Sequence, residues 1–249
     1  MERRIQAKPT FLFAFAHRLS KSDKEKLDLI VQRLGGDSRM SEDMYVRDAT
    51  HVVVPDGSSE NDWCPKIIGA LAAGKTVLRT SYLIQSAQNG FFLPFLDDHI
   101  PQHFEAISRH YRRFGKPFQG VNAMVAIGSS RRRIELNSIL RDAGAEVTVG
   151  PIDAQHHEQL VKVDIVFTDT ILSQNLELQN FVQWRREQTY KAEADQGSSV
   201  QCRPMQVASY FGIFKVIQSC AKGKAEREKI LSLFDVNNHE TMAKIHPRS

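Results

Sequence analysis

The feature that most constrains the fold is an internal repeat of one apolar pattern. Four apolar residues at i, i+3, i+4 and i+7 make one buried stripe on a helix, and the same pattern returns 109 residues later. The first set is Leu27, Ile30, Val31 and Leu34, and the second is Leu136, Ile139, Leu140 and Ala143. A glycine directly follows each set. Because internal repetition indicates units built on one plan, we expect two similar structural units.

Strand and helix patterns around this repeat give both halves the same order of elements: strand, helix, strand, strand, helix, strand, helix. In the first half we expect strands at 10–16, 51–54 and 76–78, and helices from 22, around 66 and at 80–88. In the second half we expect strands at 121–127, 146–149, 164–167 and 200–203, and helices behind 130, at 175–186 and at 206–219. Ser22 and Glu25 match the capping box that begins a helix. The alternation predicts an α/β fold with a small, mostly parallel four-stranded sheet flanked by helices in each unit.

Length and composition narrow the class of protein. The 249 residues suffice for one large domain or two of ordinary size. No apolar run reaches the roughly 20 residues that cross a bilayer, and the first residues lack a signal peptide's apolar core, so we expect no membrane partner. Cys64, Cys202 and Cys220 are odd in number and scattered, which favours free thiols in a reducing compartment. The net charge of +4 favours an acidic partner without indicating nucleic acid by itself.

A phosphate-loop pattern, G-x-x-x-x-G-K-[ST], spans Gly69 to Thr76. That loop binds phosphate only when a strand precedes it and a helix follows, because the helix N-terminus must point at the phosphate. Here Pro65 suits a first helical turn, Gly74 suits a helix end, and a strand follows. We therefore reject a nucleotide-binding loop.

Residues that would indicate an enzyme or a metal centre do not form a recognisable group. His156 and His157 lie in a polar segment without carboxylates at ligand spacing. Asp164 and Asp169 flank a buried strand and resemble turn residues. We expect no catalysis, no metal and no cofactor.

A basic segment at 96–116 separates the two halves. Its basic side chains are Arg109, His110, Arg112, Arg113 and Lys116. We interpret it as a solvated linker with one helical turn packed between the units. Its charge would also suit an acidic partner.

Several motifs resemble those of the BRCT domain. In the first half they are Leu34-Gly-Gly, Thr50-His-Val-Val-Val, Ala73-Gly-Lys-Thr-Val-Leu and Ser81-Tyr-Leu. In the second half, Gly144-Ala-Glu-Val and the run from Val163 to Asp169 are similar to a more divergent BRCT repeat. The resemblance implies a tandem pair, with BRCT-like domains at 9–97 and 119–235, a linker at 98–118 and a tail at 236–249.

Tandem BRCT pairs of this type bind phosphoserine or phosphothreonine peptides. The family holds the phosphate with a Ser/Thr hydroxyl at the end of the first strand, the next backbone N–H, and a lysine at the start of the second helix. Lys66 matches that lysine. The sequence departs at the hydroxyl, which falls on Ala16 or His17, so Arg18, His17 and Ser20 are the candidate replacement donors.

Four further residues are candidates for a peptide groove. Trp63 stands where several relatives carry an arginine, and it either packs a peptide side chain or covers the core. Ile68 either lines the pocket for the residue three places after the phosphate or belongs to the core. Arg131 and Arg132 begin the first helix of the second unit, where they either face the peptide or form a solvated basic face.

The resemblance implies a phosphopeptide-binding scaffold module of a nuclear protein in the DNA-damage response, DNA repair or the replication checkpoint. The implied partner is a phosphorylated checkpoint or repair factor or a phosphorylated histone tail. Two alternatives stay open. One is a phosphate-independent protein-interaction scaffold, which the missing hydroxyl favours. The other is a DNA-binding module, which the basic segment favours and which would lose affinity steeply with salt.

Overall fold

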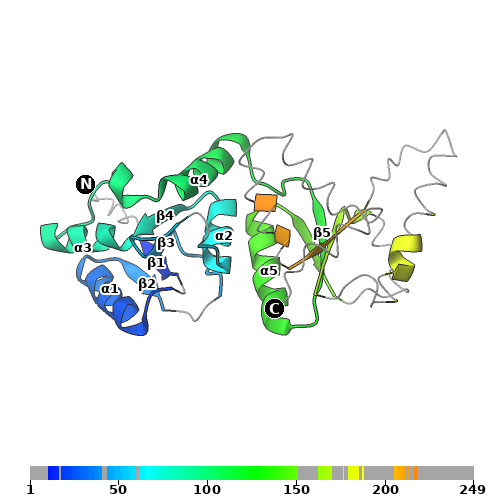
Figure 1. Cartoon of the computed structure of the whole chain (residues 1–249), viewed down its shortest axis with the longest axis horizontal. Coiled ribbons are helices and arrows are strands. Elements are labelled where there is room, and N and C mark those ends of the chain that lie inside the picture. Colours follow the sequence, from blue (N-terminus) through cyan, green and yellow to red (C-terminus); the bar gives the residue numbers. More distant parts are fainter. Residues whose placement is uncertain are drawn as a thin grey trace, which may run out of the picture. The chain divides into compact units, whose positions relative to one another are not determined.

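The computed structural model describes two compact units, at Met1–Gly115 and Lys116–Ser249 (Figure 1). The described residues are 11–16, 18–40, 44–59, 62–150, 162–169, 179–184 and 205–210, together with 176, 187, 212, 213, 216 and 217. Among them no helix has the length and apolar character needed to cross a membrane.

The first unit contains a sheet of four parallel strands. These are β1 (Leu12–Phe15), β2 (Asp37–Arg39), β3 (His51–Val54) and β4 (Thr76–Arg79), in the order β2-β1-β3-β4. Its helices are α1 (Lys21–Arg33), α2 (Pro65–Ala72) and α3 (Thr80–Asn89). Helices α1 and α3 pack together on one side of the sheet, and α2 covers the other side (Figure 1). The predicted order of elements is confirmed.

The core of the first unit lies between the sheet and the helices α1 and α3. Phe13, Phe15, Val53 and Leu78 from the strands form one buried cluster with Tyr82 of α3 there, each at most 1% exposed. Burial of each such side chain stabilises the fold by roughly 1.5–3 kcal/mol. The Tyr82 hydroxyl donates to the Leu93 carbonyl at 3.0 Å, so the ring is buried while its polar end is satisfied.

Helix α1 begins two residues earlier than the predicted capping box requires. Its N-cap is Ser20, whose side chain accepts a hydrogen bond from the Asp23 backbone N–H at 3.1 Å. The prediction of Ser22 as the cap was wrong, because the Ser20 side chain accepts the N-cap hydrogen bond from the Asp23 N–H.

The segment interpreted as a linker forms ordered structure in the first unit. A 3-10 turn at Asp97–His99, labelled η1, is followed by α4 (Gln102–Phe114), which packs against α2 and β4. Phe104 and Tyr111 bury one face of α4. The prediction of a single helical turn was wrong. Charged residues interrupt the apolar spacing of α4, so its sequence lacks a clear helical pattern, but in the structure these residues have partners within the fold.

The second unit repeats the four-stranded parallel sheet. Its strands are β5 (Asn122–Ala126), β6 (Glu146–Val149), β7 (Ile165–Thr168) and β8 (Gln206–Ser209), in the order β6-β5-β7-β8. Helix α5 (Ser130–Asp142) carries the repeated apolar stripe, and residues 179–184 are helical as predicted.

The last strand of the second unit differs from the prediction. The expected strand at 200–203 lies outside the described residues, while β8 occupies 206–209, where we expected a helix to begin. Parallel pairing with β7 prevails over local helix propensity in this segment, since Val207 and Ala208 are buried beside Val166 and Phe167.

Candidate phosphate-binding site

Lys66 connects the start of α2 to the end of β1. Pro65 occupies the first turn of α2, where its missing N–H costs no helical hydrogen bond. Lys66 follows it and is only 2% exposed, and its Nζ donates to the Phe15 carbonyl at 2.9 Å. The ammonium group therefore lies at the carboxyl end of the first strand, beside the positive end of the α2 dipole.

The C-terminal end of α2 lacks the order of a phosphate-binding loop, as predicted, because a helix precedes the glycine and a strand follows it. Gly74 has φ of 73°, the left-handed conformation that ends a helix, and the Lys75 N–H bonds back to the Ala70 carbonyl at 2.8 Å. The lysine of the apparent motif is structural, because its Nζ donates to the Tyr45 hydroxyl at 3.0 Å and to the Arg47 carbonyl at 2.5 Å. Strand β4 then follows.

An ion pair joins the two loops that flank the end of β1. Arg18, from the loop before α1, pairs with Asp62, from the loop before α2. The Arg18 side chain is 57% exposed, whereas that of Asp62 is 8% exposed. The other Asp62 oxygen accepts the Ser59 N–H at 2.8 Å. The neighbourhood of Lys66 therefore contains both an accessible guanidinium group and a competing carboxylate.

The remaining candidates for the missing hydroxyl differ in what they offer. Ala16 is 2% exposed and its N–H donates to the Val53 carbonyl at 2.9 Å, so this position supplies no ligand. The Ser20 hydroxyl caps α1 and also donates to the Asp23 carboxylate at 2.6 Å. Its role as a phosphate ligand conflicts with those two bonds. His17 lies outside the described residues.

Two of the groove candidates pack inside the first unit. Ile68 is 0% exposed, which favours the second of its two alternatives, a place in the core. Trp63 is partly buried, and its ring meets the edge of Phe104 from α4, with centroids 5.5 Å apart and planes at 74°. Its packing matches the prediction that it covers the core.

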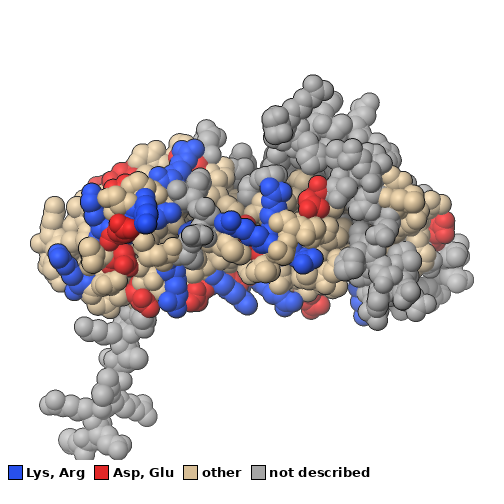
Figure 2. Space-filling view, turned by 90° about the horizontal axis from the view of Figure 1, so that it is seen from below, with Lys and Arg blue, Asp and Glu red and all other residues tan. Residues whose placement is uncertain are grey.

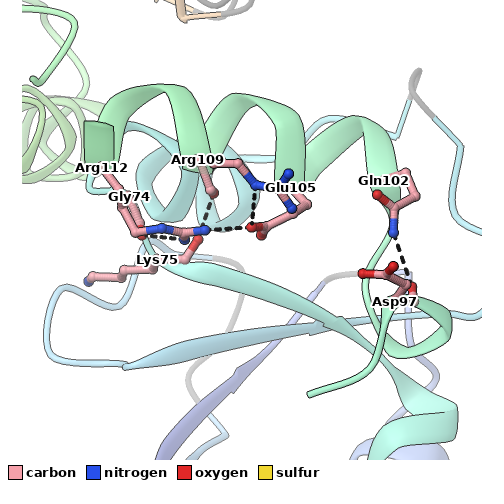
Figure 3. Close-up of polar contacts among 8 residues, drawn as sticks. Gly74, Lys75, Asp97, Gln102, Glu105, Arg109 and Arg112 are labelled. Atoms are coloured by element: carbon pink, nitrogen blue, oxygen red, sulfur yellow. Dashed lines mark hydrogen bonds and ion pairs between the residues drawn. The ribbon is translucent and has the colours of Figure 1, made fainter. Parts of the chain in front are cut away.

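Helix α4 holds the far end of α2 through polar contacts (Figure 3). Arg112 donates to the Gly74 carbonyl at 2.9 Å, and the Ser108 hydroxyl donates to the Lys75 carbonyl at 2.7 Å. Glu105 anchors Arg112 at 2.5 Å. A cation at the C-terminal end of α2 is favourable for the helix dipole. Together with the contact between Trp63 and Phe104, α4 thus secures both ends of the helix that carries Lys66.

This support was missed in the sequence because the segment was interpreted as a linker. The available signal was the i, i+4, i+7 spacing of Phe104, Ser108 and Tyr111, all buried in the structure. The ion pair between Arg18 and Asp62 had no sequence signal, since it joins loops 44 residues apart.

Arg131 and Arg132 lie in the exposed first turn of α5 in the second unit. The Arg132 guanidinium lies over the Tyr210 ring, 5.5 Å from its centroid, and the Tyr210 hydroxyl donates to the buried Glu135 carboxylate at 2.5 Å. Burial, with the carboxylate beside it, raises the pKa of Tyr210 well above its usual range. Contact of these arginines with a peptide stays a prediction.

In the second unit, an acidic side chain from the end of β7 reaches the turn after β5. Asp169 follows β7, and its carboxylate accepts the Gly128 N–H at 3.1 Å in the turn after β5. Within the described parts of both units, no group of three or more His, Cys, Asp or Glu side chains is arranged to hold a metal ion.

Comparison with known proteins gives the fold but no matching family by sequence. No protein-family model matches the chain, and no curated protein sequence matches it. The BRCT5–BRCT6 domains of Brc1 from S. pombe superpose with a TM-score of 0.54 at 10% identity, covering 87% of this chain and 94% of that one. The described fold is therefore that of a tandem BRCT pair.

Two further solved structures are similar at lower scores. Rtt107p (residues 820–1070) has a TM-score of 0.44 at 10% identity, covering 84% of this chain and 86% of that one. Rad4 BRCT1,2, solved in complex with a Crb2 phosphopeptide, has a TM-score of 0.30 at 14% identity, covering 85% and 93%.

Proposed function

We propose that this protein is a phosphopeptide-binding scaffold module, and that its first unit holds the phosphate of a phosphoserine or phosphothreonine at the end of β1. The observation that carries the proposal is the placement of Lys66, whose Nζ reaches the Phe15 carbonyl from the first turn of α2. This is the place that the BRCT resemblance gives to the phosphate-binding lysine.

The charges at this place suit a phosphate dianion. Burial of an ammonium group is costly unless hydrogen bonds and opposite charge compensate it. A phosphate carries close to two negative charges at neutral pH and accepts several hydrogen bonds. It would stabilise both Lys66 and the positive end of α2. Arg18 adds a planar guanidinium group that can bind two phosphate oxygens at once, provided that it exchanges Asp62 for the phosphate.

The proposed partners and setting rest on resemblance. The motifs of the first unit resemble those of the C-terminal BRCT pair of the topoisomerase II-binding protein and of the mediator of DNA-damage checkpoint. Rad4 BRCT1,2 was solved with a Crb2 phosphopeptide. We therefore propose a phosphorylated checkpoint or repair factor, or a phosphorylated histone tail, as the partner, and the nucleus as the location.

The test is a fluorescence-anisotropy titration of an oriented phosphopeptide library, with each peptide also measured after dephosphorylation. The unmodified protein is expected to prefer selected phosphopeptides by at least about 100-fold, since charge-assisted hydrogen bonds to a dianion contribute roughly 1.5–3 kcal/mol each. Lys66→Met is expected to remove that preference.

Two controls make the result decisive. Lys26→Met removes an exposed lysine of α1 and is expected to keep full selectivity. Urea unfolding shows whether Lys66→Met remains folded. Selectivity retained by a folded Lys66→Met protein contradicts the proposed site. Equal binding of phosphorylated and plain peptides by the unmodified protein favours the phosphate-independent scaffold, for which the absence of a hydroxyl at Ala16 is the supporting observation.

A further inference from the structure

The net positive charge of this chain comes from one part of its sequence. Residues 106–134 contain seven Lys and Arg and no Asp or Glu, so the rest of the chain carries a net charge of −3. Elsewhere the signs are mixed: in the view of Figure 2, Lys and Arg side chains lie among Asp and Glu side chains on the first unit. The seven cations are Arg109, Arg112, Arg113, Lys116, Arg131, Arg132 and Arg133.

The exposed face of α4 arranges part of this charge around an aromatic ring. Arg109 and Arg113 are one helical turn apart, and both are exposed. His110 and Phe114, the residues that follow them, have the same spacing; Phe114 is exposed and His110 is partly buried. Phe114 is 67% exposed, more than any other phenylalanine among the described residues. The Arg113 guanidinium lies 5.0 Å from the ring centroid of Phe114, and the His110 ring lies 5.0 Å away at 45°.

The described elements packed most closely against α4 contribute no carboxylate to this face. Helix α2 and strand β4 contact α4, and the sequence from Pro65 to Arg79 contains no Asp or Glu. The one acidic residue of α4 is Glu105, which is buried and engaged by Arg112 at 2.5 Å and by Arg109 at 3.5 Å. The exposed charge of the helix face is therefore positive.

From this face we infer a second binding surface, for single-stranded nucleic acid. Arg109 and Arg113 contact consecutive backbone phosphates, and Phe114 provides a ring on which one base stacks. Proteins that bind single strands without sequence preference combine cations with aromatic rings on which bases stack, and each stacked base contributes substantially to affinity. A peptide rich in carboxylates would use the arginines without needing the exposed ring. This surface is independent of the phosphate site at Lys66.

The test measures binding of fluorescein-labelled dT20 to the whole chain by anisotropy at several salt concentrations. Arg109→Gln with Arg113→Gln is expected to weaken binding about tenfold at low salt. It should also make the log–log salt slope less steep by about 1.4, since each single-strand phosphate contact contributes roughly 0.7. Phe114→Ala is expected to weaken dT20 binding about tenfold and to leave binding of a 20-base-pair duplex within about twofold.

The matched control is Lys21→Gln with Lys26→Gln, which removes two exposed cations from α1 and gives the same net charge. It is expected to change dT20 binding less than twofold, as is Lys66→Met. An equal loss in the α1 double variant overturns the proposal, because it shows that binding follows total charge. Displacement of dT20 by a poly-glutamate peptide at equal charge concentration, or an unchanged affinity in Phe114→Ala, also overturns it in favour of an acidic polypeptide.

Discussion

The two units build the same sheet but differ in the charged groups at corresponding strand ends. In the first unit, the lysine of α2 donates to the last carbonyl of β1. In the second unit, the Asp169 carboxylate accepts a backbone N–H from the turn after β5. Paired strands align Phe13 with His51 in one unit and Ala123 with Ile165 in the other, so the two edges correspond. Among the described residues, the group at this edge suits an anion in the first unit and disfavours one in the second.

The largest expected effect concerns the stability contributed by His51, the first residue of strand β3. His51 is 9% exposed among the rings of Phe11, Phe13 and Phe95, and burial lowers its pKa from 6.5 to about 4. The unfolded chain therefore binds the extra proton between pH 6.5 and pH 4 while the folded chain does not. Stability is complete above pH 6.5 and falls as pH drops through this window, by on the order of 3 kcal/mol at most.

Urea unfolding followed by tryptophan fluorescence tests this difference between the units. Trp184→Phe leaves Trp63 as the reporter of the first unit, and Trp63→Phe leaves Trp184 for the second. The first unit is expected to lose stability between pH 6.5 and pH 4.5, and His51→Leu should flatten that dependence. The second unit, with Ile165 at this register, should respond less. Equal acid sensitivity of both units, or of the His51→Leu variant, would contradict the assignment.

A smaller effect is expected from the contacts of α4 with the end of α2. Arg112→Gln removes the hydrogen bond to Gly74 and leaves the buried Glu105 carboxylate without its nearer cation. Since the Arg112 side chain is 41% exposed, solvent screens part of the loss, and we expect a cost of about 2 kcal/mol confined to the first unit. Urea unfolding with Trp63 as the reporter measures it, and Arg113→Gln is the exposed control. A shift in the Trp184 transition alone would contradict the packing.

The smallest expected effect is a change in phosphopeptide affinity when the charge of Asp62 is removed, compared with removal of the Asp169 charge in the second unit. Asp62→Asn keeps an oxygen for the Ser59 N–H but removes the charge that holds Arg18. We expect phosphopeptide affinity to rise about fivefold, or about 1 kcal/mol, because Arg18 is released and a nearby negative charge is lost. Asp169→Asn in the second unit is expected to leave affinity unchanged. Lower affinity in Asp62→Asn would show that the ion pair builds the site instead of competing with phosphate.

Periodicity in the sequence was sufficient to predict most of the fold. The repeated helix stripe and the flanking apolar runs predicted three strands of the first unit and the α/β class, because buried parallel strands and amphipathic helices have distinct patterns. Strand β8 was missed, since its short apolar run also suits a helix and only pairing with β7 decides between them.

The candidate site was predictable only in part. Lys66 was found through its match to the lysine of the BRCT motif, and the structure places it at the strand end. Ser20 was a candidate donor, and Ile68 was either a pocket residue or a core residue; in the structure Ser20 caps α1 and Ile68 is buried. The pairing of Arg18 with Asp62 depends on two loops meeting in space, which local patterns do not encode.

The most direct test of the central claim observes the ammonium group of Lys66 itself. The side-chain signals of lysines in the labelled protein are followed by NMR during titration with a selected phosphopeptide, and Lys66→Met identifies the signal of interest. We predict that the Lys66 signal shifts in proportion to bound peptide, while that of Lys75, engaged by Tyr45 and Arg47, stays in place. A saturated complex in which the Lys66 signal has not moved would contradict the account.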